Sequence, residues 1–222
     1  MKPKPALVRI LWAVTLLLML IGVAIVIRRT LTLFAPSPPR ADFPNAAAMD
    51  TGFARHPLLT MLHITPGLLF ILLAPLQFVR RLRNRKPNLH RWTGRVVLIA
   101  GIIIGSSALV MSPQMAIGGP NETAATMLFA TVFLFSLITA FLHIRRGRVA
   151  LHREWMIRAF AVGFAVATIR PIVGGFFATS RLTHLTPHDF FGTAFWLGFT
   201  IQLMVAEIWI DYTRPRILRA SE

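Results

Sequence analysis

The chain has 222 residues, of which 55% are hydrophobic and only 14% are charged, so an ordinary soluble domain is excluded. Its 24 Lys and Arg residues outnumber 8 Asp and Glu, which gives a formal net charge of +16. Cysteine is absent, and this excludes disulfides, thiolate metal sites, iron–sulfur clusters and covalent c-type haem attachment.

Six apolar segments have the roughly 20 residues that a membrane-spanning helix needs. They cover residues 6–27, 57–79, 95–116, 124–144, 155–178 and 190–212. The first is too long for the core of a signal peptide and lacks a cleavage site, so it is expected to remain as a helix. We therefore predict an all-α polytopic membrane protein with a single membrane domain over residues 1–222 and an outer loop at 28–56. Spans two to five are expected to form a core four-helix bundle, with spans one and six at its periphery.

The basic residues predict the orientation of these spans. Seven Lys and Arg side chains lie within residues 80–95, and loops of this kind stay in the cytoplasm. Both the N-terminus and the C-terminus are then cytoplasmic, and a bacterial inner membrane is the expected location. The excess of positive charge is explained by anionic lipid head groups, since no basic-aromatic nucleic-acid motif accompanies it. The lipid bilayer is thus an expected partner and nucleic acid is not; protein partners cannot be assigned.

Two ionisable residues are expected to meet inside the bilayer near the cytoplasmic face. Arg158 of span five and Glu207 of span six lie at similar depth when helical rise is counted. A charged residue at the centre of a span costs roughly 2.5–3.5 kcal/mol, so each needs a partner. We predict an Arg158–Glu207 ion pair that holds span six to the bundle.

A polar cavity is expected in the outer half of the bilayer. His63, Gln114 and Arg170 lie at comparable depth, and each is close to a proline that bends its helix and frees a backbone carbonyl. Such a cavity could hold an anionic group or the head group of a quinone. The alternative is that the prolines are packing kinks and that Arg170 extends outward to the surface.

Three histidines are expected near the cytoplasmic face, at the ends of three different spans: His90, His143 and His152. Two histidines from different helices at one level are what a b-type haem requires, and three could also hold zinc or copper. The alternative is that they are interfacial residues that meet lipid phosphates together with the neighbouring arginines.

Three segments form a recognisable pattern: His63-x-x-x-Gly67 with Ala74-Pro75-Leu76-Gln77-Phe78, then His90-Arg91-Trp92-Thr93-Gly94-Arg95, then His152-Arg153-Glu154-Trp155-Met156-Ile157-Arg158. Together they resemble the pattern of a bacterial family of predicted membrane proteins of unknown function. The resemblance covers roughly residues 55–175. Ala74 and Val97 depart from the usual glycine and tyrosine. The resemblance implies the helical layout and singles out these residues, but it implies no activity.

The arrangement of helices and histidines is also similar to that of cytochrome b561-like proteins, by analogy of layout alone. The leading hypothesis is therefore a membrane redox or redox-assembly protein, with haem b held by two of the three cytoplasmic histidines and a quinone near His63 and Arg170. One alternative is a small transporter or channel whose polar path passes His63 and Arg170. Another is a non-catalytic scaffold or assembly factor of a respiratory complex. No catalytic residue can be assigned.

Overall fold

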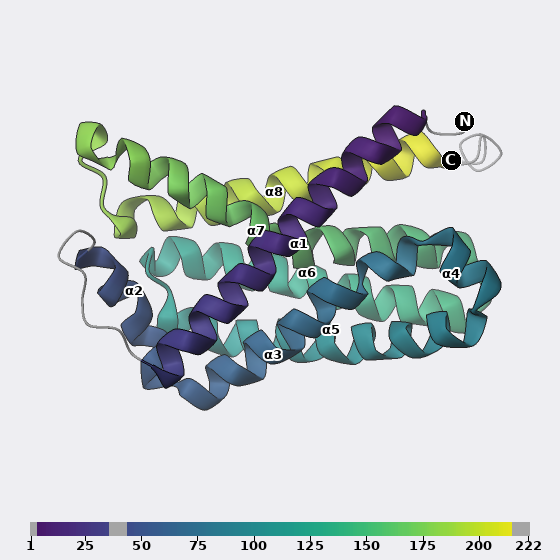
Figure 1. Cartoon of the computed structure of the whole chain (residues 1–222), viewed down its shortest axis with the longest axis horizontal. Helices are drawn as coiled ribbons and strands as arrows, with labels where there is room; N and C mark the ends of the chain where they lie inside the picture. The colour runs from purple at the N-terminus through teal and green to yellow at the C-terminus, as the bar shows by residue number, and fades with distance from the viewer. Residues whose placement is uncertain (1–3, 36–43, 215–222) are drawn as a thin grey trace.

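The computed structural model describes residues 4–35 and 44–214, and every regular element in this part of the chain is helical (Figure 1). Six helices are long and apolar enough to cross a membrane, which confirms the all-α class with six spans. They are α1 (Pro5–Phe34), α3 with η1 (Pro57–Leu73 and Pro75–Phe78), α5 (Pro87–Met115), α6 (Gly119–Arg145), α7 (Val149–Thr183) and α8 (Pro187–Thr213). The expected outer loop falls partly outside the described residues, as do both chain ends.

Proline marks the start of most of these helices. It occupies the first or second position of α1, α3, α5, α6 and α8, where its missing N–H has no helical partner to lose. Two segments expected to be loops are partly helical. The basic residues form α4 (Arg80–Arg85) and the first turns of α5, and the outer segment contains α2 (Pro44–Arg55). Arginine is a good helix former, so a basic segment does not need to be a loop.

Each long helix packs against its neighbours in the chain from α3 to α8, and α8 also packs against α6. Helix α1 crosses the bundle obliquely and contacts α3 and α7 (Figure 1). The start of α1, the end of α8 and α4 lie at the same end of the bundle, and α2 lies at the other (Figure 1). We call these the α4 end and the α2 end.

The core extends beyond the four helices expected from the sequence, because α8 contributes to it. Phe190 and Phe191 of α8 are each only 1% exposed. The ring of Phe190 stacks on Phe176 of α7 with centroids 5.1 Å apart, and Phe177 meets it edge-on at the same distance. Span six is thus an integral part of the bundle, whereas α1 adds only partly buried side chains to the core.

Glycines bring α5 and α7 close to the core rings. A Cβ on Gly163 would lie 2.5 Å from Cε1 of Phe70, and one on Gly101 would lie 2.6 Å from Cδ1 of Leu137. Phe70 is 1% exposed and meets Phe133 edge-on with centroids 5.5 Å apart. Small residues that allow close approach are the usual means of packing helices in a membrane.

The contact between Gly163 and Phe70 predicts a position-specific effect of a single methyl group. Gly163→Ala is expected to lower the free energy of unfolding by about 1–3 kcal/mol, because the buried ring cannot move away. Gly174→Ala in the same helix is the matched control, since nothing lies within 4 Å of its Cβ position. That variant should be neutral or stabilising by up to about 1 kcal/mol. Thermal unfolding in detergent measures both, and equal behaviour of the two variants would contradict the packing.

Candidate functional site

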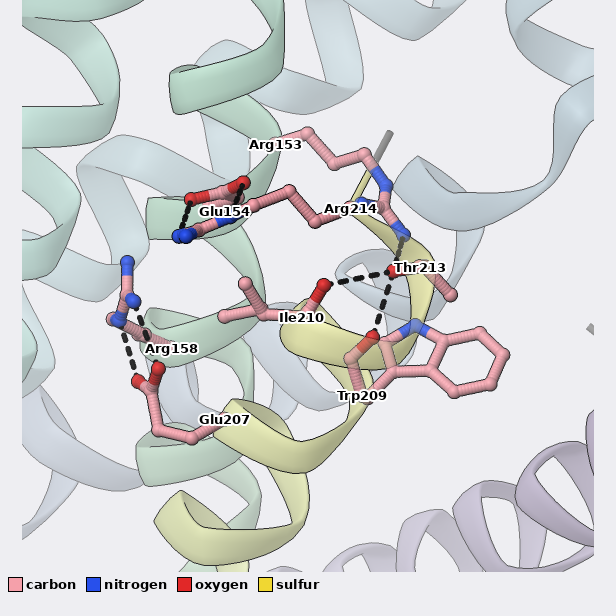
Figure 2. Close-up of polar contacts among 8 residues, drawn as sticks. All are labelled: Arg153, Glu154, Arg158, Glu207, Trp209, Ile210, Thr213 and Arg214. Atoms are coloured by element: carbon pink, nitrogen blue, oxygen red, sulfur yellow. Dashed lines mark hydrogen bonds and ion pairs between the residues drawn. The ribbon is translucent and has the colours of Figure 1, made fainter. Parts of the chain in front are cut away.

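The α4 ends of α7 and α8 are joined by three polar contacts (Figure 2). Arg158 donates from Nε to Oε1 of Glu207 at 2.5 Å and from a terminal nitrogen to Oε2 at 2.8 Å. Arg214 donates to both carboxylate oxygens of Glu154 at 3.2 and 3.1 Å. We call these residues, with Arg153 and Thr213, the α7–α8 clamp.

The third contact of the clamp joins the guanidinium of Arg153 to the end of α8. Arg153 donates to Oγ1 of Thr213 at 2.8 Å, and the same hydroxyl donates to the carbonyl of Trp209 at 2.7 Å (Figure 2). Arg158 also lies over the ring of Trp155, 4.6 Å from its centroid. The Arg158–Glu207 contact is the one that the sequence predicts. The other two contacts were not anticipated, because they depend on how far α8 extends.

An apolar groove lies beside Glu207 between α6 and α8. Its volume is about 360 Å³, and it is lined by Phe129, Thr200, Leu203, Met204, Glu207 and Ile208. The accessible surface of this lining is almost entirely apolar. A groove of this composition suits hydrocarbon rather than a polar substrate.

The three predicted histidines gather at the α4 end. His90 lies in the first turn of α5, His143 in the last turn of α6 and His152 in the first turn of α7. His152 is within electrostatic range of both His90 and His143. Its Nδ1 lies 2.9 Å from the carbonyl oxygen of Ala140. The Nδ1 atoms of His90 and His143 are buried and have no hydrogen-bond partner.

These histidines do not converge on one point. Within residues 4–35 and 44–214, no group of three or more His, Cys, Asp or Glu side chains is placed to hold a metal ion. The zinc or copper alternative is therefore not supported, because a tetrahedral or tetragonal site needs three or more donors around one atom. A haem iron needs only two axial ligands from the protein, so this alternative is unaffected.

Two of the sequence motifs meet next to His90. Gln77 of η1 donates from Nε2 to Oγ1 of Thr93 on α5 at 2.7 Å, and Thr93 donates to the carbonyl of Leu89 at 2.8 Å. A Cβ on Gly94 would lie 3.2 Å from Oε1 of Gln77. Gln77 thus fastens the chain before α4 to the turn of α5 that carries His90, and Gly94 gives the amide room.

The polar residues predicted for the outer half do not share partners. Nδ1 of His63 lies 2.9 Å from Oγ of Ser107 on α5. Gln114 is exposed and donates to the carbonyl of Val110 in its own helix at 3.1 Å. Arg170 interacts electrostatically with Glu122 of α6 and with Arg29 of α1. The three residues thus interact with different groups, and a cavity that joins them stays a prediction.

Sequence reasoning missed a charged cluster at the α2 end. Asp50 of α2 accepts from Arg29 at 2.5 Å and from Arg28 at 2.8 Å, and Arg29 lies over the ring of Phe53, 3.9 Å from its centroid. Glu122 is buried and accepts from the backbone N–H of Gly118 at 2.7 Å. The sequence did contain one signal for this cluster. Arg28 and Arg29 lie in a segment expected on the outer side of the membrane, where the positive-inside rule disfavours arginine.

The clamp predicts a specific response to loss of one charge. Glu207→Gln leaves the Arg158 guanidinium without a counter-ion inside a span, so we expect the free energy of unfolding to fall by about 1.5–3 kcal/mol. Replacing both residues, as Arg158→Met with Glu207→Leu, removes both charges and should restore most of the loss. Thermal unfolding in detergent compares the two proteins. A double variant no more stable than Glu207→Gln would show that the pair does not act as a unit.

Comparison with known proteins places the chain in a family. A family model described as "Predicted membrane protein (DUF2306)" matches residues 60–210, which include α5 to α8 up to Ile210 and nearly all of α3. No curated protein and no solved structure is significantly similar to the chain. The match spans more than half of the sequence. The chain therefore belongs to this family of predicted membrane proteins, whose function is unknown.

Proposed function

We propose that this integral membrane protein binds a b-type haem at its α4 end and acts in electron transfer. The observation that carries the proposal is the gathering of three histidines from three consecutive helices, two of which have buried ring nitrogens without a partner. An unpaired buried polar atom costs about 1–3 kcal/mol, so it calls for a ligand or a further partner. The histidines are also on neighbouring helices, as a bis-histidine haem site requires.

His152 is the best-prepared ligand of the three. A carbonyl oxygen can only accept a hydrogen bond, so Nδ1 of His152 must carry the proton that it shares with Ala140. In the neutral ring, Nε2 then has a free lone pair for iron. Donation from the second ring nitrogen to a backbone carbonyl is the usual way in which proteins orient a metal-bound histidine.

The second ligand comes from His90 or His143. The hydrogen bond between Gln77 and Thr93 holds the turn of α5 that carries His90, because Thr93 lies on the same turn. Arg83 and Arg91 are within electrostatic range of His90. These arginines would neutralise the haem propionates, since guanidinium groups form strong forked hydrogen bonds with carboxylates. We therefore assign His90 and His152 as the residues that would hold the haem iron, with His143 as the alternative to His90.

The chain's own residues have three tasks in this function. The two imidazoles would hold the iron and the arginines would hold the propionates. The clamp keeps the start of α7 fixed relative to α8. The haem would supply one-electron exchange when bound. A quinone between His63 and Arg170 is not part of this function, because the two residues have different partners.

A spectrum of the purified protein tests the proposal. Expressed with a haem supply, the wild-type protein should show a Soret band and equimolar haem in detergent. His90→Ala and His152→Ala should each abolish the band, whereas His56→Ala, an exposed histidine at the α2 end, should retain it. Gel filtration and thermal unfolding would show that the variants still fold. A wild-type protein without the band, or retention of the band in both His90→Ala and His152→Ala, would overturn the assignment.

We also propose that the α4 end faces the cytoplasm of a bacterial cell and that the bilayer is the inner membrane. Support comes from the arginines of α4 and of the α6–α7 turn, which are hard to carry across a bilayer. A fluorescent reporter fused after Arg214 should fold and a phosphatase fused there should be inactive. Phosphatase inserted at Leu185, between α7 and α8, should be active. The reverse pattern at both positions would contradict the orientation.

A further inference from the structure

We propose that the α2 end contains a second site, which binds a phosphate group through Arg170. Arg170 lies within α7, just before Pro171, and its Nε is buried without a hydrogen-bond partner. A guanidinium is always charged and has five N–H donors in a fixed fork. An unsatisfied buried N–H in a charged fork favours an anionic acceptor.

The nearest carboxylate does not satisfy this need. Glu122 is within electrostatic range of Arg170, but its Oε2 accepts from the backbone N–H of Gly118 at 2.7 Å. Glu122 is thus already used to cap the start of α6, and it balances the Arg170 charge only from a distance.

The other charges around Arg170 are positive. Arg29 and Arg28 at the end of α1 are both within its electrostatic range. Asp50 is shared between these two arginines at 2.5 and 2.8 Å. Among the residues that the structure describes here, three arginines face two carboxylates, which leaves one positive charge in excess. An uncompensated charge in this setting is costly unless a mobile anion occupies the site.

Phosphate is the anion that this arrangement fits best. Arginine forks bind phosphate through two parallel hydrogen bonds, and several arginines around one point are typical of phosphate recognition. The site lies toward the end of the bundle, where lipid head groups carry phosphate, although a soluble phosphate ion has the same chemistry. The shared feature is a tetrahedral oxyanion with at least one negative charge.

Binding measurements with two probes distinguish these sources. The probes are inorganic phosphate and a short-chain phosphatidic acid, added to protein in a phosphate-free, non-ionic detergent and followed by calorimetry. We expect Arg170→Gln to weaken binding about 10- to 100-fold, the effect of losing a hydrogen bond to a charged group. Arg55→Gln, which removes an exposed charge at the same end, should leave the affinity unchanged. Binding of the lipid probe alone would assign a head group, and binding of both would assign a general phosphate site.

A second variant keeps the test decisive if Arg170→Gln fails to fold. Glu122→Gln retains the side-chain oxygen that accepts from Gly118. It removes the one carboxylate that, among the described residues, interacts with Arg170. It should therefore bind the same probe several-fold more tightly, a gain that structural damage cannot produce. Failure of both probes to bind the wild type, or equal affinity in all variants, would overturn the proposal. The haem spectrum should be unaffected by either variant, so the two sites can fail independently.

Discussion

A bilayer offers no hydrogen-bond partner to a charge, and this constraint explains most of the polar contacts in the molecule. Arg158 in α7 faces Glu207 in α8, and the buried Glu154 is held by Arg214. At the other end, Arg29 is only 8% exposed and is paired with Asp50. Because nearly every such charge has a specific partner, the few atoms that lack one are informative. In the part of the chain that the structure describes, the buried side-chain atoms without a hydrogen-bond partner are Nδ1 of His90, Nδ1 of His143 and Nε of Arg170.

These unsatisfied atoms lie at two ends of a closely packed frame. Phe70 and Phe133 fill the space between α3, α5, α6 and α7, and the glycines opposite them leave no room for a methyl group. The aromatic contacts of Phe190 extend this packing to α8. A site built on rigid helices is held more accurately than one on loops. The packing therefore gives each end a fixed set of side chains while keeping the ends chemically separate.

The six spans and the Arg158–Glu207 pair could be predicted because they depend on hydropathy and on the position of each residue along its helix axis. Both quantities can be calculated from the sequence. The rotation of each helix about its own axis could not be predicted, and this rotation decides which side chains meet. Each residue turns the side chain by about 100°, so an error of one or two positions moves it to another face. Gln114 was expected beside His63, but Ser107 occupies that place and Gln114 is exposed. The Arg29–Asp50 pair depends on α2, and no hydrophobic periodicity in the sequence predicts that helix.

The position of the proposed haem limits what the protein can do with an electron. All three candidate ligands lie at the α4 end, and His63, the one further histidine within the bundle, is paired with Ser107. A path across the bilayer would need a second pair of ligands at another depth. The remaining histidines are His56, His184 and His188, and they lie in or beside the segments at the α2 end. The single haem that we propose at the basic end would exchange electrons with partners on that side, and the arginines of α4 would favour acidic partners. The proposed function is therefore that of an electron carrier or acceptor at one membrane face, and not that of a transmembrane conductor.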